Sequence, residues 1–444
     1  MTFHEKYDNV DALGTAKFFA NMNKHDKAKE ILDMVKPFCF NFQQYDAIGK
    51  IYSDIREFKD ALEFALKMHS LAEKNQDKWD IRTNIVRQYL NLNQPENALI
   101  YININEKLNP QDHANRMDKA MAYFLLNRKN EGESILRQIL TEPHTDDIDF
   151  RIKFNLGTYD LANGNFKDGL RHVLLDGRKL NIWETYDQLP RETMWEGGIQ
   201  PGKTILMAQE GGIGDEIISV RFQKHFRERG MHPIWYTNRK DLAEIFRRNG
   251  FEVITDLKQY RPEWLWCYSM PSPTFLDLEE DDLWYGPYIK PIRKAEKLPG
   301  KLKIGLKCMG NPKYDQDLNR TVPFEEVLSV LPEDATIYSF HIDEDLKHPR
   351  LVSLRDKIKT WDDTLDFIDQ MDYMVSSCTS TAHAASAMGK RTTVFVPILN
   401  YYTWARPTKH SKWYSENTTV FRQTTYKNWH DPIREFGEAK PWIQ

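Results

Sequence analysis

The first part of the 444-residue chain carries pairs of one aromatic and one small residue, nine positions apart. The clearest pairs are Phe19/Ala28, Tyr52/Ala61, Tyr89/Ala98 and Tyr123/Gly132. Successive pairs are separated by 33, 37 and 34 residues. This period is typical of units of two helices, in which an aromatic late in the first helix packs over a small residue early in the second. The sequence therefore predicts a helical repeat array.

The pattern resembles the tetratricopeptide repeat over roughly residues 10–178. A looser fifth copy contains Gly157, Tyr159 and Gly169. Prolines fall where a second helix should stop, at Pro37, Pro110 and Pro143. Arrays of this family commonly bind peptides or partner domains on a concave face, so the resemblance implies a protein partner of unspecified identity. A helical bundle with accidental periodicity is the alternative.

Charge and cysteine usage restrict the function classes. The formal net charge is -4, which argues against a strongly basic nucleic-acid binder. No two of the four cysteines form a C-x-x-C pair, so they indicate reduced, mostly buried thiols and suggest neither a disulfide framework nor a zinc site. No signal peptide and no membrane-spanning stretch is recognisable, so we expect a cytoplasmic protein, in the host cytoplasm if viral.

The later part of the chain alternates strand and helix patterns. A linker pattern, "EGGIQPGKT", precedes strands expected at 204–209, 232–238 and 251–255, with helices at 214–230 and 240–250. A second series has strands expected at 302–308, 336–342, 372–377 and 392–397, separated by helices at 323–331, 364–371 and 379–389. Alternation of this kind implies parallel sheets with right-handed crossovers.

An aromatic and proline-rich stretch at 264–299 separates the two series, which suggests two Rossmann-like halves facing a cleft. The expected fold class is therefore α plus α/β. We expect a repeat array at 1–178, a first Rossmann-like half at 179–300 and a second at 301–444. Ligands of open α/β sheets bind beyond the carboxyl ends of the strands.

A glycine-rich loop follows the first expected strand, in "MAQEGGIGDEIIS". Such loops usually bring backbone N–H groups close to phosphate, but the dinucleotide fingerprint requires a third glycine that is missing after Gly214. Asp215 at this loop would repel a pyrophosphate. The loop therefore favours a site in which a carboxylate acts on a hydroxyl, and it argues against an NAD site. A helix cap is the structural alternative for Asp215.

Four ordered motifs carry a second resemblance. They are "LMAQEGGIGDEIISVRF", "IGLKCMGNPKYDQDLNRTVPFEEV", "DYMVSSCTSTAHAASAMGKRTTVFVP" and "KWYSENTTVFRQ". Together they resemble tetratricopeptide-repeat glycosyltransferases of the GT-B fold, relatives of the lipopolysaccharide heptosyltransferases. The resemblance implies an inverting, metal-independent enzyme with no cofactor, which uses a nucleotide-diphosphate sugar as co-substrate. The acceptor would bind mostly to the first half and the donor to the second.

The resemblance also implies roles in the first loop. Asp215 matches the family's acidic residue, which is proposed to act as general base. An inverting transfer needs a carboxylate opposite the departing phosphate to take the acceptor's proton. Gln209, Gly211, Gly212 and Gly214 would form the acceptor-side loop around it.

The second half should bind the donor. Without a metal, cations must neutralise the leaving diphosphate, and Arg320 and Lys307 are the candidates, with a surface position as the alternative for each. The N-terminus of the helix in "TSTAHAASAMGK" is available to a phosphate. Thr379, Ser380 and Thr381 could add hydroxyl donors there. His383 matches the family's histidine and would lie near the phosphates or sugar, unless it is a packed structural residue.

Cys378 departs from the family pattern. Relatives usually carry an aspartate there, which is expected to bind hydroxyls of the donor, and a thiol is a poor hydrogen-bond partner by comparison. Either the donor sugar differs or activity is lost, and the intact Asp215, Arg320 and His383 favour the first option. The competing function class is a non-catalytic repeat scaffold with a degenerate GT-B domain.

The acceptor stays open among a saccharide, a protein side chain and a hydroxymethylated pyrimidine of phage DNA. A cluster of cations in the acceptor half is the cue for DNA: Arg221, Lys224, Arg227, Arg229, Arg239, Lys240, Arg247 and Arg248. Carboxylates interleave with these cations, so a solvated helix face is the alternative. A saccharide would instead stack on aromatics such as Trp264, Trp266, Trp404 and Trp413.

Overall fold

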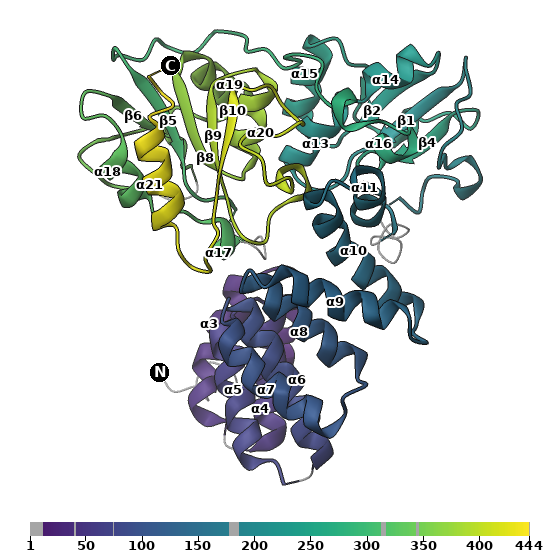
Figure 1. The fold of residues 1–444 in the computed structure, drawn as a ribbon, viewed down its shortest axis with the longest axis vertical. Helices are drawn as coiled ribbons and strands as arrows, with labels where there is room; N and C mark the ends of the chain where they lie inside the picture. The colour runs from purple at the N-terminus through teal and green to yellow at the C-terminus, as the bar shows by residue number, and fades with distance from the viewer. Residues whose placement is uncertain are drawn as a thin grey trace. The chain divides into compact units, whose positions relative to one another are not determined.

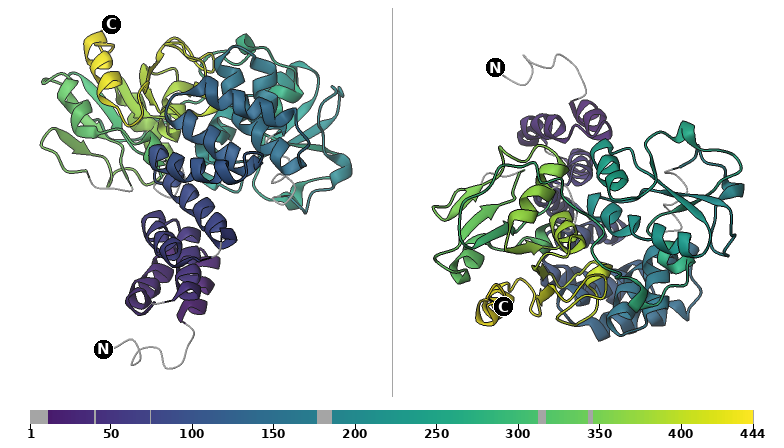
Figure 2. Two further views of the ribbon diagram at one scale, coloured as in Figure 1. Left: turned by 60° about the horizontal axis from the view of Figure 1, so that its bottom comes forward. Right: turned by 90° about the horizontal axis from the view of Figure 1, so that it is seen from above.

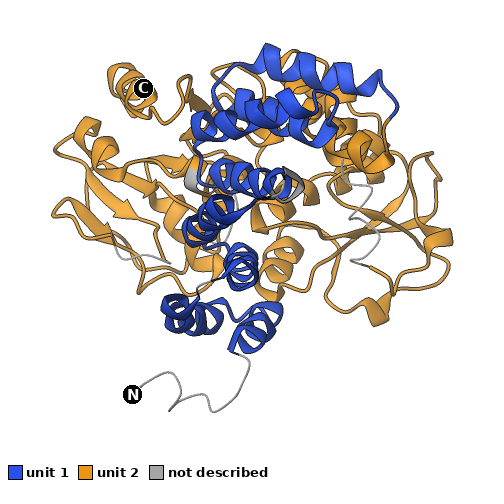
Figure 3. Cartoon of the chain, turned by 90° about the horizontal axis from the view of Figure 1, so that it is seen from below, with its two compact units in different colours: residues 1–143 blue, residues 144–444 orange. Residues whose placement is uncertain are grey.

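The computed structural model describes residues 12–39, 41–73, 75–176, 186–311, 317–342 and 346–443. The chain divides into two compact units, residues 1–143 and 144–444, which Figure 3 colours separately. None of the helices in these described ranges is both long enough and apolar enough to cross a membrane.

The described residues of the first unit form four helix pairs. They are α2 (Ala12–Asn21) with α3 (His25–Val35), α4 (Phe42–Asp54) with α5 (Phe58–Leu71), α6 (Asn75–Asn91) with α7 (Pro95–Leu108), and α8 (His113–Leu125) with α9 (Lys129–Leu140). Every predicted aromatic lies in a first helix and every predicted small residue in a second. The prolines at 37, 110 and 143 follow α3, α7 and α9, as expected.

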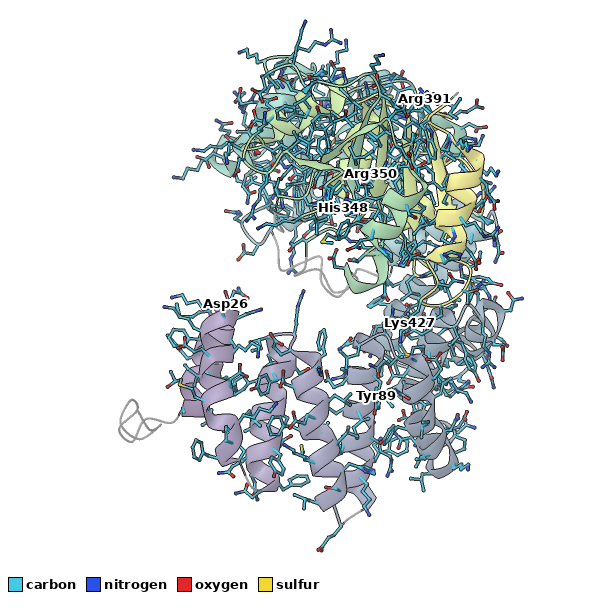
Figure 4. The ribbon with its side chains drawn as sticks, turned by 90° about the vertical axis from the view of Figure 1, so that its left-hand side faces the viewer. Asp26, Tyr89, His348, Arg350, Arg391 and Lys427 are labelled. Carbon is cyan, nitrogen blue, oxygen red and sulfur yellow. The ribbon has the colours of Figure 1, made fainter. Side chains whose placement is uncertain are left out.

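Close packing within the pairs explains the period. A Cβ on Gly132 would lie 2.9 Å from the carbonyl oxygen of Ala120 and 3.1 Å from the ring of Phe124, so only glycine fits. Tyr89, labelled in Figure 4, stacks on Tyr101 of the second helix with ring centroids 6.0 Å apart. The predicted repeat array is confirmed.

The fifth copy opens the second unit. It comprises α10 (Asp146–Ala162) and α11 (Phe166–Leu174). A Cβ on Gly157 would lie 2.8 Å from the carbonyl oxygen of Gly169, and one on Gly169 would lie 2.9 Å from that of Gly157. Leu170 and Leu174 of α11 are buried in the same core as residues of the α/β region. The division at residue 143 therefore places the fifth pair with the α/β region.

A four-stranded parallel sheet forms the first half. Its order is β3 (Val253–Ile254), β2 (His232–Tyr236), β1 (Thr204–Ala208), β4 (Leu265–Tyr268). Leu206 of β1 is paired with Ile234 on one side and Trp266 on the other. The strand β4 was not predicted, because its residues lie in the aromatic stretch interpreted as a divider between the halves.

Helices connect these strands. The single helix predicted at 214–230 is wrong, since α13 (Ile213–Val220) and α14 (Gln223–Glu228) are separate. The Arg221 side chain turns into the core at the break, where its Nε donates to the carbonyl oxygen of Ile218 at 2.9 Å. The helix α15 (Lys240–Arg248) follows β2 as expected.

A six-stranded parallel sheet forms the second half. Its order is β10 (Thr418–Arg422), β9 (Thr392–Val396), β8 (Tyr373–Ser377), β5 (Lys303–Lys307), β6 (Thr336–Ser339), β7 (Leu351–Ser353). Its helices are α17 (Asp317–Arg320), α18 (Phe324–Val330), α19 (Trp361–Gln370), α20 (Ser380–Ala387) and α21 (His430–Ala439). The edge strands β7 and β10 were not among the predicted strands.

Two arginines of this half, both labelled in Figure 4, donate hydrogen bonds to backbone carbonyl oxygens. Arg350 donates to the carbonyl oxygens of Leu328, Leu331 and Pro332 at the end of α18, at 2.5, 3.1 and 2.6 Å. These bonds satisfy carbonyls that the helix itself leaves without donors. Arg391 donates to the carbonyl oxygen of Pro441 and lies over the ring of Tyr373.

One hydrophobic core runs through both halves. It joins residues of the first sheet, such as Ile205 and Trp235, to residues of the second, such as Met374 and Val394. The two sheets and their helices are visible in Figures 1 and 2. The predicted fold class, a repeat array followed by two Rossmann-like halves, is confirmed.

Candidate active site

The loop after β1 is held by its neighbours in the first half. The Gln209 side chain exchanges two hydrogen bonds with Asn238, one through its Nε2 at 3.0 Å and one through its Oε1 at 3.1 Å. Tyr186 donates its hydroxyl to the carbonyl oxygen of Gln209 at 2.6 Å. Gly211 has a φ of +65°, a conformation that side-chain-bearing residues rarely adopt. These hydrogen bonds and the conformation of Gly211 therefore fix the loop at the carboxyl end of β1.

Asp215 lies in the first turn of α13. Its Oδ2 accepts a hydrogen bond from the backbone N–H of Gly212, which precedes the helix, at 2.6 Å. Its Oδ1 accepts a hydrogen bond from the hydroxyl of Tyr401. One oxygen therefore serves the helix end, as in the capping interpretation, and the other is contacted by the second half.

The loop lies directly against α20 of the second half. A Cβ on Gly214 would be 3.0 Å from Cδ2 of His383 and 3.4 Å from the Cα of Ser380. The two halves therefore meet where α13 and α20 begin. The carboxyl ends of β1 and β8 both lead into this region, as expected for ligand sites of α/β sheets.

The N-terminus of α20 carries the predicted hydroxyl residues. Thr379 is the N-cap residue in an extended conformation, and its hydroxyl lies 3.1 Å from that of Ser376 rather than capping the helix. Thr379 and Thr381 are buried and Ser380 is half-buried. The first N–H groups of a helix have no acceptor within it, so this turn can receive an anion.

Arg320 ends α17 beside this turn. Its Nε donates to Asp317 Oδ1 at 2.7 Å and its Nη1 donates to the carbonyl oxygen of Cys378 at 3.0 Å. Gly310 provides the space, since a Cβ there would lie 2.0 Å from Arg320 Nη2. The guanidinium is fixed one residue before the N-cap of α20, so it is not a loose surface cation.

Lys307 ends β5 and is paired in register with Ser376 of β8. It is buried, with 7% exposure, so the surface alternative is wrong for this residue as well. Its neighbour His341 follows β6 and was missed by the sequence reasoning. Burial, together with Lys307, lowers the pKa of His341 to about 3. A histidine near the carboxyl end of a predicted buried strand was the available signal.

The neutral His341 is hydrogen-bonded through both ring nitrogens. Its Nε2 accepts from the backbone N–H of Cys308 at 2.8 Å, and its Nδ1 lies 2.9 Å from the hydroxyl of Ser339. Because Nε2 accepts, the proton belongs on Nδ1, which donates to Ser339. This arrangement fixes the ends of β5 and β6 relative to one another.

His383 is packed as tightly as a structural residue. Its ring stacks on Trp404 with centroids 5.1 Å apart, and its Nδ1 lies 2.7 Å from the hydroxyl of Tyr414. Burial, assisted by Arg221 and Arg320, lowers the pKa of His383 to about 3. The imidazole is therefore neutral at pH 7 and supplies no positive charge to a diphosphate.

Cys378 lies at the predicted place between β8 and α20. Its side chain is 9% exposed and belongs to the core shared by the two halves. Burial raises the pKa of its thiol to about 11. All four cysteines are buried and free, as predicted.

The cationic cluster of the first half is not a continuous phosphate-binding face. Arg221 is fully buried and donates to the carbonyl oxygens of Leu283 and Trp413, at 3.1 and 2.5 Å. Arg239 pairs with the buried carboxylate of Glu216. Three further cations of the cluster pair with carboxylates: Lys224 with Glu228, Arg247 with Glu244 and Arg248 with Asp362. The expectation that Arg221 lies on such a face is wrong, because its side chain fills the core.

The aromatic candidates for sugar stacking are mostly core residues. Trp266, Trp404 and Trp413 are 1%, 0% and 5% exposed. Their predicted role as open platforms is wrong, because the three side chains are buried. Trp264 is half-buried.

Two Rossmann-like halves meet at a glycine-rich loop and a helix N-terminus, and a helical repeat array precedes them in the sequence, which is the architecture of a repeat array joined to a GT-B fold. The chain is similar to a mutant of the Thermobaculum terrenum O-GlcNAc transferase, with 10% identity, a TM-score of 0.36 and coverage of 97% of this chain and 91% of that one. It is also similar to the glycosyl transferase family 9 protein of Veillonella parvula DSM 2008, with 11% identity, a TM-score of 0.35 and coverage of 55% and 91%.

A third similar structure is YrrB, described as a TPR protein with an unusual peptide-binding site. It has 18% identity, a TM-score of 0.27 and coverage of 41% of this chain and 94% of that one. No protein-family model matches the chain, and no curated protein matches it.

Proposed function

We propose that the chain is an inverting, metal-independent glycosyltransferase that moves a sugar from a nucleotide-diphosphate donor to an acceptor hydroxyl. The observation that carries the proposal is the approach of Gly214 to Ser380 and His383, which brings the Asp215 loop to the N-terminus of α20. A carboxylate and an anion-binding turn, supplied by different halves, are the two parts that such a transfer requires.

In the proposed reaction, Asp215 accepts the proton of the acceptor hydroxyl. The acceptor oxygen forms a bond to the anomeric carbon of the sugar while the bond from that carbon to the diphosphate oxygen breaks. The electron pair of the broken bond leaves with the diphosphate. Attack from the face opposite the leaving group inverts the anomeric centre.

Three groups are proposed to stabilise the negative charge of the leaving diphosphate. These are the Arg320 guanidinium, the Lys307 ammonium and the first turn of α20, through the backbone N–H groups of Ser380 and Thr381 and the hydroxyls of Thr379, Ser380 and Thr381. The neutral His383 is left with a packing role against the loop. The buried thiol of Cys378 is proposed to alter donor choice relative to enzymes with an aspartate at this place.

The acceptor is proposed to be a hydroxyl of a saccharide or a protein. The burial of Arg221 and the pairing of its neighbours remove most of the cue for DNA. The repeat array is proposed to hold the acceptor's carrier or a partner protein. Binding of duplex DNA at low salt, weakening steeply as salt rises, would return DNA to consideration.

A panel of nucleotide sugars in a thermal-shift assay, followed by product analysis with saccharide and peptide acceptors, tests the function. We expect Asp215→Asn to retain donor binding and to lower turnover by roughly a hundredfold or more. Asp241→Asn, which changes an exposed carboxylate in the same half, is the matched control and should leave turnover unchanged. Equal rates for wild type and Asp215→Asn would contradict the role of the base. Donor binding without turnover in the wild type would favour a scaffold.

A further inference from the structure

We propose that Tyr401 is a positioning residue for Asp215, so that a hydroxyl from the donor half orients the base of the acceptor half. The inference rests on the proposed function, because it assigns a role to Tyr401 in the same proton transfer. Tyr401 lies in the loop after β9, and the sequence reasoning did not single it out.

The contact is specific for one oxygen of the carboxylate. Gly212 donates to Oδ2 and Tyr401 donates to Oδ1, so the two oxygens are held from opposite halves of the fold. The two side chains come from positions 186 residues apart. A carboxylate held at both oxygens cannot rotate freely about its terminal bond, and this fixes the lone pairs offered to an acceptor.

The loop that carries Tyr401 is anchored. The Tyr401 ring lies against Tyr402, with centroids 4.5 Å apart, and Tyr402 is buried with its ring 5.2 Å from that of Trp413. Trp413 in turn accepts a hydrogen bond at its carbonyl oxygen from the buried Arg221 of the first half. The hydroxyl is therefore placed by a packed structure, which is what a positioning role requires.

The chemistry follows from the direction of the hydrogen bond. A hydroxyl that donates to a carboxylate stabilises its ionised form, which is the form that can accept a proton. Tyr401→Phe keeps the ring and removes only this donor. We expect the acid limb of the kcat/KM profile to move to higher pH by about one unit. We also expect kcat to fall about tenfold at pH values below the midpoint of the wild-type acid limb, while KM for the donor is unchanged.

Tyr288→Phe is the matched control. Its hydroxyl donates to the carbonyl oxygen of Ile217 at 3.0 Å, so the change removes a hydroxyl contact to the same helix without touching the carboxylate. We expect it to lower the melting temperature and to leave the pH profile in place. A pH profile that moves equally in both variants would reduce Tyr401 to a structural residue.

A second readout separates this inference from the proposed function. In protein with 13C-labelled aspartate, the Asp215 carboxyl resonance is identified by its loss in Asp215→Asn, and its titration midpoint should rise in Tyr401→Phe. An unchanged midpoint overturns the positioning role, even if the wild type is an active transferase. A raised midpoint with no turnover by the wild type overturns the transferase and, with it, the role of Tyr401 in catalysis.

Discussion

The same substitution at two adjacent glycines, Gly211→Ser and Gly212→Ser, tests whether the loop conformation holds Asp215. Gly211 has a φ of +65°, and a Cβ there would lie 2.3 Å from Asp215 Oδ2. Gly212 has a φ of -91°, and a Cβ there would lie 3.5 Å from the same atom, an ordinary contact. The two variants therefore have the same chemistry and opposite steric consequences.

The expected cost at Gly211 has two parts. A left-handed backbone costs a residue with a Cβ about 1 to 2 kcal/mol. Displacement of the carboxylate from the Gly212 N–H removes a cap of about 1 kcal/mol. We therefore expect Gly211→Ser to lower the free energy of unfolding by roughly 2 to 3 kcal/mol. Serine is favoured at an N-cap, so Gly212→Ser should stay within about 0.5 kcal/mol of the wild type.

Urea unfolding followed by tryptophan fluorescence measures this difference. Of the 12 tryptophans all except Trp79 lie after residue 143, so the signal reports on the second unit. We further expect Gly211→Ser to lose turnover, because the displaced Asp215 no longer meets the acceptor hydroxyl. If both variants are equally stable, the loop does not constrain the carboxylate as described.

Two further predictions concern buried and charged groups. The pKa values of His341 and His383 are about 3 in the folded chain, below the usual value, so the unfolded chain binds more protons as the pH falls below 6.5. Each histidine should therefore lower the free energy of unfolding by about 1 kcal/mol between pH 6.5 and 5.5, which urea unfolding can measure. A free energy of unfolding that does not change over this range would show that the two rings are accessible to protons. Arg320→Ala should weaken binding of a nucleoside diphosphate by about 1.5 to 3 kcal/mol in calorimetry, with or without chelator; unchanged affinity would remove Arg320 from the donor site.

The sequence by itself determined the elements whose signal is local. The nine-residue spacing of pairs such as Tyr52 and Ala61 defines a helix pair, because only near neighbours along the chain are needed to form it. The buried strands β1, β5, β8 and β9 were likewise visible as apolar runs between helices. So was the glycine-rich loop that carries Asp215. The edge strand β7 is short and two of its three residues are exposed, and so it gave no apolar run.

Only the tertiary structure decided which polar groups are buried and what they contact. Arginine is a residue type usually found on the surface of a helix. Arg221 nevertheless lies in the core, where the carbonyl oxygens of Leu283 and Trp413 accept hydrogen bonds from its guanidinium. Tyr401 reaches Asp215 across 186 residues, a separation at which no spacing rule applies. His383 matches a motif, but its neutral state depends on its burial, assisted by Arg221 and Arg320. Burial and long-range hydrogen bonds exist only in the packed chain, and they set the protonation state and orientation of the site's side chains. The position of the site along the chain had already been indicated by local patterns.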